Sequence, residues 1–125
     1  MRYKIDTRTD FDIITLLYPN IDTILSEQLS DIVDQCSENG RSLILDCSNI
    51  EQVDKEVLLP LIRMHEEMYQ HDLSFVLCCL KAACKKQIAD IEEDHVLNLT
   101  PTVEEAIDLV SMEGLERELM LGDDE

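Results

Sequence analysis

Basic residues are scarce in this sequence. It has 10 Lys and Arg against 28 Asp and Glu, so its formal net charge is −18 at pH 7. A chain this acidic is repelled by phosphate backbones and by anionic lipid surfaces. The one basic cluster, Lys81, Lys85 and Lys86, is typical of a solvated helix face, and a contact with a small anion or a partner is the alternative. We therefore expect an acidic protein that does not bind nucleic acid.

Long hydrophobic runs are also missing. The longest apolar stretches, such as residues 57–62 and 75–80, fall far short of the roughly 18 residues that a membrane helix needs. The first residues contain no apolar segment of the kind that begins a secretory signal. The 5 cysteines are an odd number, which does not favour a disulfide framework and fits a reducing compartment. We expect a cytoplasmic protein without membrane insertion.

Catalytic and metal-binding patterns are absent as well. Cys47 and the pair Cys78 and Cys79 lie in apolar, strand-like runs, where cysteine usually serves as a small hydrophobic residue. A reactive thiol needs nearby positive charge, but Cys47 is followed by Glu51 and Asp54. There is no CxxC motif, and the histidines have no ligand spacing. We therefore expect no catalytic residues, no metal site, no cofactor and no enzymatic activity.

What the chain does contain is an alternation of short strands and amphipathic helices. Its 125 residues, 45% apolar and 30% charged, suit one globular domain. Apolar runs predict strands at residues 3–7, 11–18, 42–47, 73–80 and 96–99. Helical spacing predicts helices at residues 21–39, 54–71, 81–91 and from 102 onward. This order predicts an α/β fold with a mainly parallel sheet.

Two features refine these boundaries. Pro60 lies inside the second helical pattern, so either the first turn is distorted or the helix begins late, with Pro60 near its start. Near the C-terminus, Gly114 predicts a bend. We expect one domain over residues 1–112, followed at 113–125 by a helical extension and an acidic tail.

Four short motifs occur in a specific order between residues 11 and 110. They are the turn Pro19-Asn20-Ile21-Asp22, the strand and loop Leu43-Ile44-Leu45-Asp46-Cys47-Ser48-Asn49-Ile50, the segment Val53-Asp54-Lys55-Glu56-Val57, and the helix start Thr102-Val103-Glu104-Glu105-Ala106. In order and spacing they resemble the STAS domain, the module of bacterial anti-sigma-factor antagonists. The resemblance implies a βα superhelix, with a four- to five-stranded mixed sheet and about four helices.

The resemblance also implies a function. In such domains a Ser or Thr at the start of the second long helix is phosphorylated by a serine kinase that is also the anti-sigma factor. The unphosphorylated antagonist binds this kinase and frees the sigma factor, which regulates transcription by partner switching. A helix N-terminus accommodates a phosphate well, and the added charge can abolish docking. The implied partner is thus a protein, an anti-sigma factor or serine kinase, and a homodimer is left open.

The phosphorylation motif is degenerate in this chain. Asp54 keeps the acid of the motif, but Lys55 and Glu56 stand where the hydroxyl residues belong, and Val57 replaces the glycine. No Ser or Thr occurs between residues 48 and 74, so we expect no phosphorylation at this site. Glu56 is either a fixed negative charge that imitates part of a phosphate, a sign that the site has decayed, or simply a favourable acid in a first helical turn.

The resulting hypothesis is a non-enzymatic regulatory module. It would dock on its partner through loop 49–57, with Asn49 at its start, and through the helix that follows; Asp22 is a further position of the family motif. The alternatives are a nucleotide- or small-ligand-binding STAS domain, although this loop is acidic and lacks glycine, and a STAS subunit of a transport complex or an assembly scaffold. A phosphoacceptor receiver is rejected because paired acids are missing after residues 11–18.

Overall fold

The structure, a computed structural model, describes residues 2–91 and 96–122. Its strands are β1 (Tyr3–Thr7), β2 (Phe11–Leu16), β3 (Asn20–Ile21), β4 (Ser42–Asp46), β5 (Gln52–Val53), β6 (Phe75–Cys78) and β7 (Asn98–Thr100). Its helices are α1 (Thr23–Asn39), α2 (Leu58–Gln70), α3 (Ala82–Ile91) and α4 (Val103–Gly122), and a 3-10 turn, η1 (Lys55–Val57), precedes α2.

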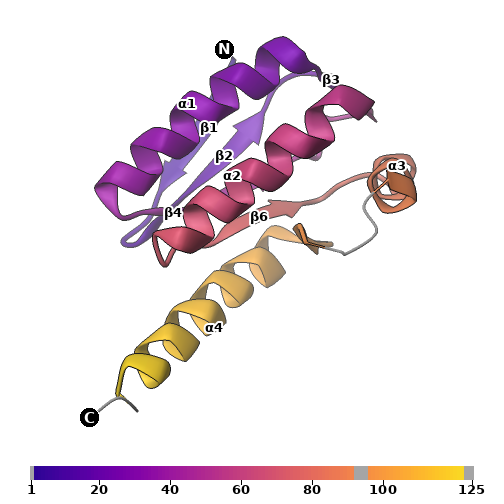
Figure 1. Ribbon diagram of the computed structural model, residues 1–125. Coiled ribbons are helices and arrows are strands. Elements are labelled where there is room, and N and C mark those ends of the chain that lie inside the picture. Colours follow the sequence, from indigo (N-terminus) through magenta and orange to yellow (C-terminus); the bar gives the residue numbers. More distant parts are fainter. Residues whose placement is uncertain (1, 92–95, 123–125) are drawn as a thin grey trace.

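Five strands form the main sheet in the order β1-β2-β4-β6-β7. β1 pairs with β2 antiparallel, and the other pairings are parallel, so the sheet is mixed. α1 and α2 lie side by side over one face of the sheet, and α4 runs along the opposite face (Figure 1). The predicted α/β fold, with a five-stranded mixed sheet and four helices in the described residues, is confirmed.

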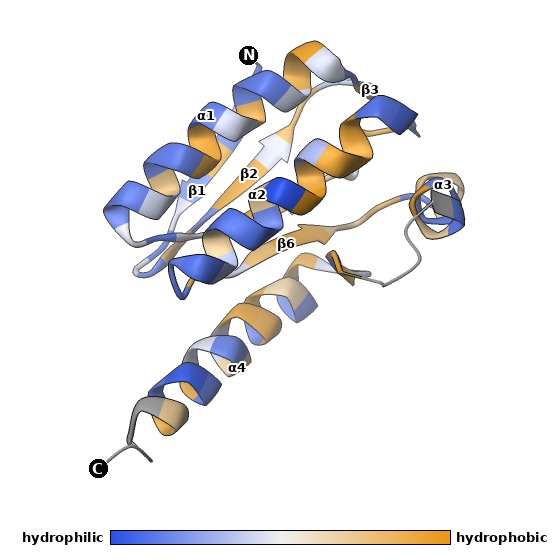
Figure 2. Ribbon diagram, viewed as in Figure 1, coloured by the Kyte–Doolittle hydropathy of each residue, from blue (hydrophilic) through white to orange (hydrophobic). Residues whose placement is uncertain are grey.

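The central strand β4 takes part in two separate cores. Leu43 and Leu45 point into the larger core beneath α1 and α2, whereas Ile44 points into a smaller core with Ala106 and Val110 of α4. All three β4 residues are fully buried, which explains the continuous apolar run predicted for a strand covered on both faces. α1 and α2 show the corresponding pattern, with most of their hydrophobic residues toward the sheet and hydrophilic ones outward (Figure 2).

The second long helix begins late. α2 starts at Leu58, and η1 covers the three residues before it. Pro60 is therefore the third residue of α2, in the first turn, where a backbone N–H has no acceptor within the helix. This placement decides between the two arrangements that the sequence left open around Pro60. No α-helix among residues 2–91 and 96–122 has the length and apolarity that crossing a bilayer requires.

α4 is a single helix that passes through Gly114 without the predicted interruption. Its second half is anchored by Arg117, whose Nη2 donates to the Leu73 carbonyl at 3.0 Å and whose Nη1 donates to the Ser74 hydroxyl at 3.2 Å. The guanidinium carbon also lies 6.0 Å from the centre of the Tyr69 ring. The predicted boundary at residue 112 thus falls inside α4, and the division into domain and extension stays a prediction.

Candidate docking surface

A two-stranded parallel ladder shapes the candidate site. β3 and β5 pair Asn20 with Gln52 and Ile21 with Val53, and the Asp54 amide donates to the Ile21 carbonyl at 3.0 Å. The ladder joins the chain before α1 to the chain before η1 and α2. Strands of two residues carry no measurable periodicity, so the sequence could not reveal this pair.

Asp22 and Asp54 follow the paired residues of this ladder directly. Asp22 is the N-cap of α1, where its Oδ1 accepts from the Leu25 amide at 2.8 Å and satisfies one of the free N–H groups of the first turn. Asp54 is the N-cap of η1, is half-buried, and makes no capping hydrogen bond. The Asp22 carboxylate therefore stabilises the start of a helix by capping it, whereas the Asp54 carboxylate does not.

The turn after Asp54 presents two charges and hides an apolar side chain. Lys55 and Glu56 are exposed, whereas Val57 is fully buried in the larger core. The turn is closed by a hydrogen bond from the Val57 amide to the Asp54 carbonyl at 3.1 Å. Of the predicted docking residues, Val57 is therefore a packing residue, because its side chain is out of reach of a partner in this conformation.

Asn49 lies at the other end of the loop and has an anchoring contact. It is exposed, and its Nδ2 donates to the Leu16 carbonyl at 3.2 Å, which ties loop 49–57 to the end of β2. Lys81, after β6, lies 3.7 Å from the Glu51 carboxylate in an exposed ion pair. The loop is thus held on two sides by neighbouring strand ends.

Two exposed apolar residues lie at the starts of α1 and α2, and the sequence patterns did not single out either of them. Ile24 is the second residue of α1 and is 66% exposed; Leu59 is the second residue of α2 and is 55% exposed. Both lie outside the buried face of their helix. An apolar residue on the polar face of an amphipathic helix is the signal that could have identified them. We refer to Ile24, Lys55, Glu56 and Leu59 as the docking surface.

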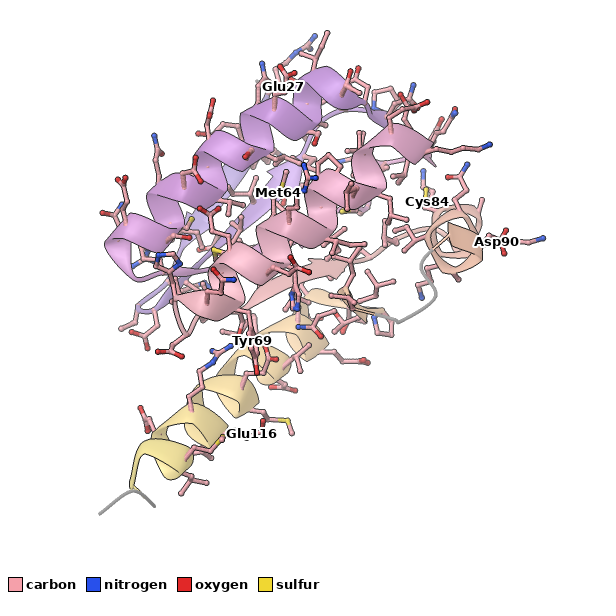
Figure 3. All side chains as sticks on the ribbon, in the orientation of Figure 1. Glu27, Met64, Tyr69, Cys84, Asp90 and Glu116 are labelled. Atoms are coloured by element: carbon pink, nitrogen blue, oxygen red, sulfur yellow. The ribbon has the colours of Figure 1, made fainter. Side chains whose placement is uncertain are left out.

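A groove lies between α1 and α2, and some of its lining residues are sequence neighbours of the docking surface. Its lining includes Thr23 and Glu27 of α1 and Pro60, Arg63 and Met64 of α2. Figure 3 shows Glu27 on α1 and Met64 on the side of α2 that faces α1. The groove combines polar and apolar groups, which is typical of a surface that contacts another protein.

A small hollow on the other side of the turn bears on the nucleotide alternative. It has a volume of about 170 Å³ and is lined by Asp54, Lys55 and Leu58 together with Gln87 and Asp90 of α3. Ligand pockets usually measure about 300–1,000 Å³. A hollow of this size with two carboxylates in its lining does not suit the phosphates of a nucleotide.

A cluster of potential metal ligands lies at the same end of the sheet. The carboxylate of Asp46, at the end of β4, and the thiols of Cys78 and Cys79, at and after the end of β6, lie within 4.8 Å of one another. Burial raises the pKa of both thiols, most strongly that of Cys78. The apolar run around these cysteines predicted packing residues, and their meeting was not expected because neighbouring side chains of a strand normally point to opposite faces.

Comparison with known proteins agrees with this architecture. The family model described as STAS domain matches residues 4–106. An anti-sigma factor antagonist from Mycobacterium paratuberculosis superposes with a TM-score of 0.73 at 17% identity, covering 88% of this chain and 93% of that one. A STAS domain protein from Planctomyces limnophilus gives 0.72 at 15% identity, covering 87% and 97%.

A serine-to-glutamate variant of RsbS from Moorella thermoacetica has a TM-score of 0.70 at 20% identity, with 94% of this chain and 99% of that one covered. At such identities the superpositions show a shared fold. The search of curated proteins finds no match.

Proposed function

This chain belongs to the STAS domain family, and from that premise we propose that it is a non-enzymatic regulatory module that binds a protein partner through the docking surface. The observation that carries the proposal is that exposed apolar residues, Ile24 and Leu59, begin α1 and α2, while η1 between them in the chain exposes two charged side chains. Apolar anchors beside a charged rim are the usual composition of a protein–protein contact. An anti-sigma factor or serine kinase is the class of partner that the family suggests.

We further propose that this module works in one fixed state. The residues of η1 offer no hydroxyl group, and Glu56 supplies a permanent negative charge next to the start of α2. A phosphate placed there would add negative charge reversibly, whereas a glutamate keeps it at all times. The partner would therefore be selected by a constant charge pattern rather than released by phosphorylation.

The test uses titration calorimetry to measure the affinity for a serine kinase of the anti-sigma class, chosen from the proteins that neighbouring genes encode. Glu56→Gln removes the charge and keeps the size, so it should change the binding free energy by ~1 kcal/mol or more. Leu59→Ala should weaken binding by a similar amount because it removes an apolar anchor. Both side chains are exposed, so the melting temperature should remain nearly unchanged.

Matched controls come from the opposite face of the sheet. Glu105 is an exposed first-turn acid of α4, and Leu119 is an exposed apolar residue of the same helix. Glu105→Gln and Leu119→Ala should leave the affinity unchanged. Equal affinities for wild type, Glu56→Gln and Leu59→Ala would overturn the proposed docking surface.

A second measurement addresses the fixed state. After incubation with the same kinase and ATP, mass spectrometry of residues 49–73 should find no phosphate on the wild-type protein. The only hydroxyl side chain of that stretch belongs to Tyr69. Phosphate on Tyr69 would contradict the fixed state and would place a switch on α2 instead.

A further inference from the structure

The backbone at the end of β6 departs from a regular strand at a cysteine. Cys78 is the last residue of β6, and Cys79 follows with a φ of 63°, in the left-handed region that favours glycine. In a regular strand, successive side chains point to opposite faces. The two thiols instead lie close together, within 4.8 Å of each other and of the Asp46 carboxylate.

The carboxylate of this cluster is held in place by neighbouring groups. The Asp46 carboxylate accepts from the Ser48 amide at 3.0 Å and from the Thr15 hydroxyl at 3.4 Å. The backbone amide of Val103, the first residue of α4, lies near the Cys79 thiol. Amides at a helix N-terminus favour negative charge on the group they face. Two hydrogen bonds thus hold the Asp46 carboxylate next to the two thiols.

We propose that Asp46, Cys78 and Cys79 form a binding site for a thiophilic divalent cation of the Zn²⁺ class. Two sulfur ligands and one carboxylate oxygen are a donor set that suits Zn²⁺ and Cd²⁺ and does not suit Mg²⁺ or Ca²⁺. Bonds of about 2.3 Å to sulfur and about 2.0–2.2 Å to oxygen would draw the three atoms slightly closer together. Asp46 and Cys79 are half-buried, so solvent reaches the cluster and can supply a fourth ligand.

The left-handed backbone of Cys79 indicates that its side chain has a role beyond packing. A glycine at position 79 would adopt a φ of 63° without strain, yet the sequence carries a thiol there. Strained backbone at a residue with a side chain is typical of sites where that side chain has a task. The task proposed here is to bring a second sulfur to the same cation.

Binding is an exchange of protons for the metal. Each thiol loses its proton to solvent as its sulfur binds the cation, and the Asp46 carboxylate binds as an anion. No sulfur changes its oxidation state, so no oxidant or reductant takes part. The charges of two thiolates and one carboxylate leave a net charge of −1 on the complex with a divalent cation.

The test is a titration of the full chain with Cd²⁺, followed by ultraviolet absorption, with a phosphine reductant present. The expected result is one Cd²⁺ per chain with the absorption of thiolate-to-metal charge transfer. Cys79→Gly and Asp46→Asn should each weaken binding by roughly 10–100-fold. Cys36, a buried cysteine of α1 outside the cluster, provides the control: Cys36→Ala should bind as wild type does.

Cys79→Gly also separates a lost ligand from a lost fold. Glycine suits the left-handed backbone, so the melting temperature of the Cys79→Gly variant without metal should be equal to or above that of the wild type. Weaker Cd²⁺ binding in this variant with an intact melting transition supports the site. Unchanged binding in Cys79→Gly, absence of charge-transfer absorption in the wild type, or an equal loss in Cys36→Ala would each overturn it.

Discussion

The side-chain oxygen of Gln87 accepts a hydrogen bond from the Val53 amide at 3.2 Å. Val53 is the last residue of β5. This strand pairs with β3 along one edge, and Gln87 contacts its opposite edge. A half-buried residue of α3 thus takes the place that a further strand would occupy beside β5. Because Asp54 and η1 follow Val53 directly, this contact helps to fix the position of the docking surface.

Removing the acceptor at position 87 should loosen this edge. Gln87→Met keeps the length of the side chain but leaves the Val53 amide without its partner, so the free energy of unfolding should fall by about 1 kcal/mol. Gln87→Glu keeps an oxygen acceptor and should lose less. Urea denaturation measures both. A smaller loss for Met than for Glu would contradict the role assigned to the hydrogen bond.

Two glycines should respond to the same substitution with opposite signs. Gly40 ends α1 with a φ of 68°, and an added Cβ would meet no atom within 4 Å, so Gly40→Ala should cost about 1 kcal/mol through backbone strain alone. Gly114 lies inside α4, also with open space around it, so Gly114→Ala should stabilise the protein by roughly 1 kcal/mol. Thermal unfolding of the two variants tests both signs.

Glu67 should make stability depend on pH. Burial raises the pKa of its carboxyl, and a hydrogen bond with Asp34 and the charge of Asp34 raise it further, while His71 opposes the shift. The folded state thus binds this proton more tightly than the unfolded state. The contribution is fully present below the ordinary pKa of 4.5 and is lost as pH rises through the raised value.

Glu67→Gln should therefore stabilise the protein at neutral pH, by up to about 0.5 kcal/mol, because the repulsion from Asp34 disappears. The gain should shrink as the pH falls toward the ordinary pKa. Denaturant unfolding at several pH values measures this. Glu66 is the exposed neighbour and offers the matched change: an identical pH profile for Glu66→Gln and Glu67→Gln would contradict the assignment to the Asp34 contact.

Arg117 should decide how firmly the C-terminal half of α4 is attached. Arg117→Met keeps the apolar stem and removes the donors to Leu73 and Ser74, so the free energy of unfolding should fall by about 1–2 kcal/mol. The stability of Arg117→Lys should lie between those of the wild type and Arg117→Met, because an ammonium group cannot reproduce the planar fork of the guanidinium.

A chain ending at residue 112 should still fold, with lower stability. Failure of this shortened chain to fold would refute the proposed domain boundary.

Strong local patterns made most of the fold predictable. The predicted strand at residues 3–7 matches β1, and the helix predicted to end at residue 39 does end there, with Gly40 as the left-handed C-cap of α1. The helix start predicted at Thr102 is also present, since the Thr102 hydroxyl accepts from the Glu105 amide at 3.1 Å and caps α4. In each case a short pattern meets no competing tertiary demand, so local chemistry decides the structure.

The site was less predictable because its features depend on tertiary contacts. The burial of Val57 follows from the turn that η1 makes, and the exposure of Ile24 and Leu59 follows from the way α1 and α2 begin. The meeting of Cys78 and Cys79 depends on one left-handed residue that no propensity favours in cysteine. These features are set by how elements meet, and a single sequence does not encode them in a local pattern.

The two-core position of β4 has a consequence for hydrogen exchange. Its amides pair with β2 on one side and β6 on the other, and its side chains are buried above and below the sheet. No local opening frees β4 without dismantling both cores, so its slowest amides should exchange only by global unfolding and report the full stability of the fold. β1, whose five residues are all exposed, should exchange through local fraying long before.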